Sequence, residues 1–135
     1  MCTSRIVQYN MDRLAMGEEY NLSDIIVNMV VPDYKMGNYA FGYIDKKDGA
    51  FVVCYVGRSD SDLKKEIKQQ MKTDCAKGCT HFKFSIASTK KEAFEKECRN
   101  YHDFGGRDHL HNENHPDKPD GTKYKCSVEG CEYND

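Results

Sequence analysis

The chain has 135 residues, which suits one domain and leaves no room for a second sizeable core. Its sequence lacks the run of ~20 apolar residues that a membrane span needs, and it lacks the N-terminal pattern of a signal peptide, so we expect a cytoplasmic protein without a membrane partner. The formal net charge is −2, whereas most proteins that bind the nucleic-acid backbone carry a basic excess. A local basic surface is still compatible with this total.

The predicted elements begin with a lead-in segment over residues 1–36. Its short apolar run, Ile25 to Val31, is closed by Pro32 and followed by Gly37. This pattern leaves room for one short helix or strand before the main domain.

A β-hairpin is predicted next. Its first strand has aromatic side chains at every second position: Tyr39, Phe41 and Tyr43. Residues 50–56 are β-branched and aromatic and form the second strand. Because Asp48-Gly49 is a turn signal between them, the simplest arrangement is an antiparallel hairpin that brings Tyr39 near Tyr55.

A helix, a third strand and a second helix follow. N-cap residues at 59–62 precede apolar residues spaced by four, which predicts a helix of about three turns. Residues 81–86 alternate as a strand does, and Thr89 to Glu92 has the spacing of a capping box that opens the second helix. Gly105-Gly106 ends this helix, and the remaining residues lose periodicity.

Two short motifs and one carboxylate connect these elements to a known family. Gly37-Asn38-Tyr39 and Tyr55-Val56-Gly57, followed by Glu97 on the second helix, resemble the GIY-YIG nuclease family. The resemblance covers residues 37–104. It implies an α/β (α+β) fold in which a small three-stranded antiparallel sheet is flanked by helices, and residues 105–135 add a loop-rich tail.

The resemblance implies a metal-dependent endonuclease that hydrolyses nucleic-acid phosphodiester bonds, with DNA favoured over RNA. Tyr39 and Tyr55 would take the places of the two motif tyrosines, where a tyrosine positions or deprotonates water. Their separation is longer than usual in the family. Tyr43 is therefore a competing candidate, because it shares a face with Tyr39 and lies closer in sequence to Tyr55.

Glu97 would match the family's metal-binding glutamate, which implies Mg²⁺ or Mn²⁺ at this residue. Helix geometry selects Glu97 independently. Phe94, Cys98 and Tyr101 form the predicted buried stripe of this helix. At ~100° per residue, Glu97 lies within about 60° of Phe94 and so borders the stripe. A carboxylate that borders the core needs a partner, which could be a divalent cation, a tyrosine hydroxyl or a backbone amide.

The family's phosphate-steadying arginine on the first helix is replaced here by Glu66, which could repel phosphate or could help Glu97 hold a metal. Arg58, directly after the second motif, could replace the missing arginine or could be a surface residue. Lys65 is adjacent to Glu66 but about 100° round the helix.

A row of lysines recurs every four residues on the first helix: Lys64, Lys68 and Lys72. This row could follow a nucleic-acid backbone or could be a solvated face. His102 on the second helix could supply acid-base help or could be structural.

The seven cysteines are an odd number, and without a secretory signal free thiols or metal ligands are favoured over a disulfide framework. Cys126 and Cys131 in the tail are a candidate zinc half-site. Further donors are available elsewhere: Cys75, Cys79, His109, His111 and His115. The sequence thus supports three functions, namely an endonuclease, a catalytically inactive module of the same fold that binds nucleic acid or protein, and a small zinc-binding protein.

Overall fold

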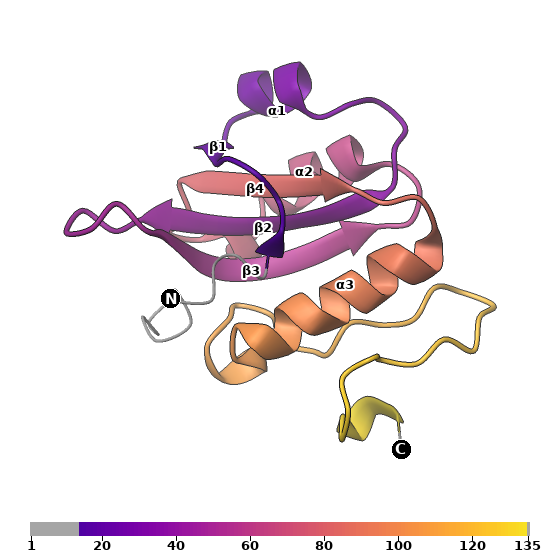
Figure 1. The fold of residues 1–135 in the computed structure, drawn as a ribbon. Helices are drawn as coiled ribbons and strands as arrows, with labels where there is room; N and C mark the ends of the chain where they lie inside the picture. The colour runs from indigo at the N-terminus through magenta and orange to yellow at the C-terminus, as the bar shows by residue number, and fades with distance from the viewer. Residues whose placement is uncertain (1–13, 135) are drawn as a thin grey trace.

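The predicted hairpin forms the middle of the sheet. In the computed structural model, which describes residues 14–134, strand β2 (Gly37–Ile44) pairs antiparallel with β3 (Phe51–Ser59). The next predicted strand, β4 (His81–Ile86), pairs antiparallel with the other edge of β2. Figure 1 shows the resulting sheet, whose strand order is β1-β4-β2-β3, between helices on its two faces.

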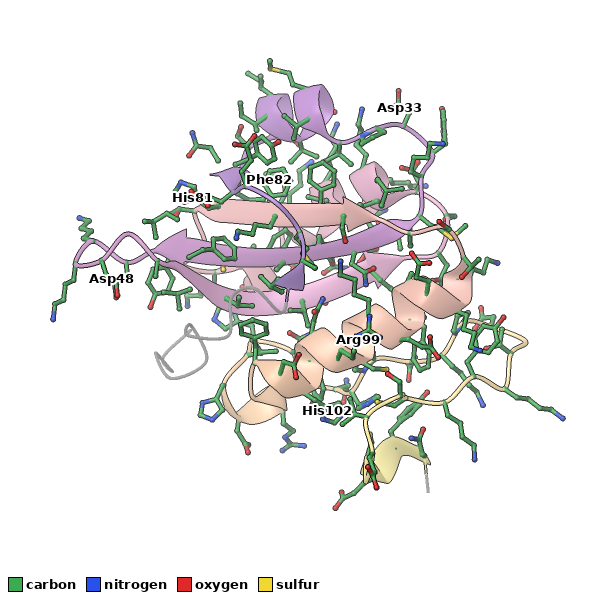
Figure 2. The ribbon with its side chains drawn as sticks, viewed as in Figure 1. Asp33, Asp48, His81, Phe82, Arg99 and His102 are labelled. Carbon is green, nitrogen blue, oxygen red and sulfur yellow. The ribbon has the colours of Figure 1, made fainter. Side chains whose placement is uncertain are left out.

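The prediction of three strands is wrong by one short strand. β1 (Tyr20–Asn21) comes from the lead-in segment and pairs antiparallel with β4, where Tyr20 lies opposite Phe82 and Asn21 lies opposite His81. Figure 2 labels Phe82 and His81 on β4. The Tyr20 and Phe82 rings are 5.8 Å apart. Two residues are too few to show a hydrophobic period, so this strand is defined by its packing on β4. The fold is α+β with a four-stranded antiparallel sheet.

Three helices pack on the sheet: α1 (Asp24–Val30), α2 (Leu63–Gln70) and α3 (Lys90–Asp103). Each follows a side chain that accepts a hydrogen bond from a first-turn backbone N–H: Ser23, Asp62 and Thr89. α2 is shorter than predicted, because the backbone leaves the helix at Met71 although this side chain still packs on the core. No helix among the described residues is long and apolar enough to span a membrane.

The two faces of the sheet carry separate cores. α1 and α2 cover one face, where Tyr39 of β2 packs with Leu63 and Ile67 of α2. α3 covers the opposite face, where buried residues of the sheet and the helix meet: Ala40, Val53, Val56, Tyr101 and Phe104. Because alternate strand residues point to opposite faces, Tyr39 and its neighbour Ala40 belong to different cores.

A β-bulge and a glycine place the two motif tyrosines side by side. The register sets Tyr39 opposite Gly57 and Phe41 opposite Tyr55, and then shifts by one residue. The Tyr39 and Tyr55 rings are 6.1 Å apart, which confirms the proximity that the hairpin predicted. Gly57 leaves room for the Tyr39 ring, since a Cβ atom at residue 57 would overlap the phenol end of that ring.

The tail covers the outer edge of β3 before it packs on α3. The His111 backbone N–H donates to the Cys54 carbonyl at 2.6 Å. The Asn112 side chain accepts from the Val56 N–H at 3.0 Å and donates to the Val56 carbonyl at 2.7 Å. Asn112 therefore takes the place of a neighbouring strand at this edge. The described part of the tail contains two short 3-10 turns: Gly106–Asp108 and Glu132–Asn134.

We predict that Gly57→Ala destabilises the protein by about 1–3 kcal/mol, because the new methyl group overlaps the fully buried Tyr39 ring. Urea denaturation of both proteins measures this change. In a Tyr39→Leu background, where the ring is absent, the Gly57→Ala cost should shrink. An equal cost in both backgrounds would mean that the contact with Tyr39 is not the cause.

Candidate functional site

The candidate site lies where β3 ends beside α3. The Arg58 Nη1 atom forms an ion pair with Glu97 Oε1 at 2.7 Å. Only 10% of the Arg58 side chain and 11% of the Glu97 side chain are exposed, so Arg58 is not a free surface residue. The predicted burial of Glu97 beside the α3 stripe is confirmed. Among the described residues its hydrogen-bond partner is Arg58, and not the tyrosine or backbone amide that the sequence left open beside a divalent cation.

Arg58 is held on three sides. Its Nε and Nη2 atoms bond the two carboxylate oxygens of Asp60 at 2.9 and 3.3 Å. Its guanidinium lies over the Phe94 ring of α3, 5.1 Å from the ring centroid. The role of Asp60 was not predicted from the sequence. The available signal was the spacing of two residues, which puts Asp60 on the same side as Arg58 where the strand ends.

Glu66 takes a role that its position in the sequence did not reveal. Its Oε2 atom accepts a hydrogen bond from the Tyr39 hydroxyl at 3.0 Å. Tyr39 is fully buried, and this burial, with the charges of Tyr55 and Glu66, raises the pKa of Tyr39 well above its ordinary value. Burial also raises the pKa of Glu66, while the bond from Tyr39 opposes that change.

Tyr55, and not Tyr43, stands beside Tyr39. The Tyr55 ring is half-buried and stacks on Phe41, with ring centroids 5.9 Å apart. Tyr43 packs farther along the hairpin with Val52 and neighbouring residues. Burial is the main reason that the pKa of Tyr55 lies above its ordinary value.

A cavity of about 700 Å³ opens beside Tyr55. Its wall is made by the segment after α2 and by the start of the tail, including Cys75, His111 and Asn112. The His111 ring bonds the Cys75 carbonyl at 2.9 Å and so joins the two walls. Tyr55 is therefore the motif tyrosine that a ligand in this cavity would reach.

Negative charge exceeds positive charge around this site. Glu97 interacts with the carboxylates of Glu66 and Asp60 as well as with Arg58. Burial raises the pKa of Glu97 to about 7, Arg58 opposes this, and the two other carboxylates add to it. Three acidic groups around one guanidinium favour an additional cation over a bare phosphate.

We predict that the ionisation of Glu97 lowers stability as the pH rises. The pKa of Glu97 is about 7 in the folded protein and 4.5, its ordinary value, in the unfolded chain, so the folded state holds an extra proton between these pH values. The stabilisation is complete below pH ~4.5 and is lost as the pH rises through ~7. Urea denaturation across this range, in buffer free of magnesium and manganese, measures the slope.

Glu97→Gln is the control for this slope, because the amide cannot titrate. The difference between the two pH profiles isolates Glu97 from Glu66 and His102, whose pKa values are also shifted. Parallel profiles would show that Glu97 is ionised throughout the range.

A second cluster joins α3 to the tail. Its members offer ligand atoms that all lie within 4.8 Å of one another: His102, His115, Cys126 and Cys131. This group could hold a metal ion. Figure 2 labels His102 near the end of α3. The sequence pointed to both cysteines and to His115 as possible donors. It did not point to His102 as a ligand, because no local pattern shows that the tail folds back onto α3.

The other possible donors lie elsewhere. His109 is exposed, and neither it nor Cys75, Cys79 or His111 belongs to the cluster found among the described residues. The free cysteines agree with the expectation of thiols: Cys75, Cys79, Cys98, Cys126 and Cys131. Cys54 is disulfide-bonded, which corrects that expectation at one position. A disulfide requires two cysteines whose Cα atoms lie within about 7 Å, and a sequence pattern does not show this separation.

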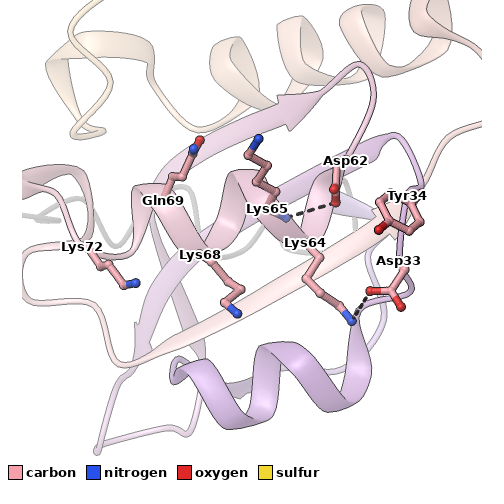
Figure 3. A pocket seen from close by; sticks show the side chains of 8 residues that line it. All are labelled: Asp33, Tyr34, Asp62, Lys64, Lys65, Lys68, Gln69 and Lys72. Atoms are coloured by element: carbon pink, nitrogen blue, oxygen red, sulfur yellow. Dashed lines mark hydrogen bonds and ion pairs between the residues drawn. The ribbon is translucent and has the colours of Figure 1, made fainter.

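The lysine row on α2 is partly structural. Lys64 bonds Asp33 at 2.7 Å, and Lys68 bonds the Asn28 side chain of α1 at 2.9 Å. Figure 3 shows both side chains on the α1 side of α2, beside a pocket of about 580 Å³. Lys65 and Lys72 are exposed and line the same pocket. Two of the three lysines in the row therefore link α2 to α1 and the segment after it. The basic surface available to a ligand is smaller than the spacing of the row predicted.

Comparisons with known proteins add no relative to this description. No protein-family model, no curated protein and no solved structure matches the chain.

Proposed function

We propose that this protein is a metal-dependent endonuclease of the GIY-YIG type that hydrolyses phosphodiester bonds of nucleic acid, DNA in preference to RNA. One observation carries the proposal. Four groups that are separated along the chain lie near the same end of the sheet, two tyrosines on its α2 face and an ion pair on its α3 face: Tyr39, Tyr55, Arg58 and Glu97. Tyr55 is the member of this group that lines a cavity, and titratable groups with shifted pKa values near a cavity are typical of a reaction site.

Charge and donor type at Glu97 fit Mg²⁺ or Mn²⁺. These cations prefer carboxylate oxygens and take one or two of them together with water and substrate phosphate. Arg58 engages Oε1 of Glu97, and the site carries an excess of acidic groups. A bound divalent cation would supply Lewis-acid stabilisation of the charge on the phosphate and its leaving oxygen.

The protein's own groups take the remaining roles. Arg58 can shift its hydrogen bonds from Glu97 to a phosphate oxygen, where its fixed charge stabilises the transition state. Tyr55 faces the cavity and would position the attacking water or take its proton. Tyr39 is fully buried and bonded to Glu66, so it acts as a positioning residue that packs against Tyr55.

We predict that Glu97→Gln and Arg58→Ala each lower cleavage at least ~100-fold, because each removes charge stabilisation of the transition state. The assay offers duplex, branched and single-stranded DNA and RNA with Mg²⁺ or Mn²⁺. Glu92→Gln is the matched control, since Glu92 is an exposed carboxylate on the same helix and should retain full activity.

If the unaltered protein cleaves nucleic acid and Glu97→Gln cleaves it equally well, the assigned site is wrong. The absence of cleavage by the folded, unaltered protein on every substrate would contradict the endonuclease proposal. That result would favour a binding module that has lost catalysis, for which the pairing of Arg58 with two carboxylates supplies the reason.

The same proposal predicts where nucleic acid binds. Lys65→Ala/Lys72→Ala replaces the two exposed lysines of the α2 pocket and should weaken nucleic-acid binding. The slope of log K against log salt concentration should become shallower by roughly 2, about one unit for each lost phosphate contact. Fluorescence anisotropy over a range of salt concentrations measures both quantities. Lys46→Ala/Lys47→Ala, at the exposed hairpin turn, is the matched control and should not change them. Equal effects of the two pairs would indicate a nonspecific charge effect.

A further inference from the structure

Four donor atoms from distant parts of the chain meet beside α3. His102 lies on the helix, His115 follows it in the tail, and Cys126 and Cys131 flank a short loop near the C-terminal end. In a tetrahedral zinc site, bond lengths of about 2.0–2.3 Å place neighbouring ligand atoms about 3.3–3.8 Å apart. The Cys131 Sγ atom is 3.3 Å from His115 Nε2, and all four donor atoms lie within 4.8 Å of one another. Small side-chain movements would therefore complete the tetrahedron.

His115 is oriented with a free ring nitrogen toward the other donors. The Nδ1 atom of His115 lies 2.8 Å from the Pro116 carbonyl, which can only accept, so Nδ1 carries the proton. The lone pair of His115 is then on Nε2, the atom that faces Cys131. Stacking on Tyr133, with ring centroids 4.3 Å apart, holds the ring in this orientation.

His102 supplies an independent observation. Its Nε2 atom is buried and has no hydrogen-bond partner among residues 14–134. A buried nitrogen in that state is unfavourable unless another group satisfies it. A metal ion among the four donors would do so, because His102 already lies 5.2 Å from the His115 ring, centroid to centroid.

The cysteine loop is also held in place. The Asn134 side chain accepts from the Cys126 N–H at 2.9 Å and donates to the Cys126 carbonyl at 2.8 Å. The Asn134 backbone N–H donates to the Cys131 carbonyl at 3.2 Å, which fixes the backbone that carries the second sulfur. Both cysteines are free and buried.

We propose that His102, His115, Cys126 and Cys131 bind one Zn²⁺ ion in a closed structural site that fastens the tail to α3. The donor chemistry selects the metal class, because two sulfurs and two imidazoles suit tetrahedral zinc, whereas calcium and magnesium prefer oxygen. Four protein ligands leave no position for a substrate. The ion is therefore separate from any divalent cation at Glu97.

The zinc content of the purified full-length protein tests this assignment. Elemental analysis after dialysis, under a non-thiol reductant, should find one zinc per folded chain. Replacement of each ligand should remove it: His102→Ala, His115→Ala, Cys126→Ser and Cys131→Ser. Two groups of matched controls should retain it: the exposed histidine variant His109→Ala, and the free-cysteine variants Cys75→Ser and Cys98→Ser. Cys98 is the most informative control, because it packs in the same buried cluster as Cys126 and Cys131 without belonging to the four donors.

Cobalt substitution keeps the test decisive if a ligand variant does not fold. The unaltered protein with Co²⁺ should show the visible bands of a tetrahedral ion and the near-ultraviolet charge transfer of two thiolates. A folded protein without zinc, or an octahedral cobalt spectrum, would overturn the proposal. Loss of zinc in Cys98→Ser with retention in His102→Ala would overturn the assigned ligand set.

Discussion

The buried ion pair between Arg58 and Glu97 is the interaction on which the arrangement of the candidate site depends. It joins the end of β3 to the middle of α3, and both partners are almost wholly enclosed. Breaking such a pair by removing one partner leaves a buried charge uncompensated, which typically costs about 3–5 kcal/mol. Asp60 and the Phe94 ring hold the guanidinium from other sides, so the direction of α3 over the sheet is closely specified.

Charge and burial give the site a consistent chemical character. Tyr39 is packed into the space left by Gly57 and is bonded to Glu66, while Tyr55 remains open to a cavity. The acidic excess around Arg58 disfavours a phosphate until a cation offsets it. Substrate binding and cation binding would then be coupled, because each reduces the cost of the other.

α3 carries two different sets of donors. Glu97 offers oxygen on the side that faces the sheet end, and His102 offers nitrogen about 140° farther round the helix. Hard cations prefer the first set and zinc prefers the second, so two metals could be sorted by donor type alone. Phe94 lies between the two regions, since it supports the Arg58 guanidinium and packs with Cys126 and Cys131.

Local patterns in the sequence determined the secondary structure: the period-two strands, the capped helices, the hairpin and the buried position of Glu97 all follow from neighbouring residues. Tertiary structure decided the rest. Three contacts join residues that are far apart in the sequence, so no local pattern predicts them: the pairing of β1 with β4, the ion pair of Arg58 with Glu97, and the bond from Tyr39 to Glu66. His102 is the clearest case, because an imidazole on a helix becomes a potential ligand only when a tail without periodicity folds back and brings sulfur to it.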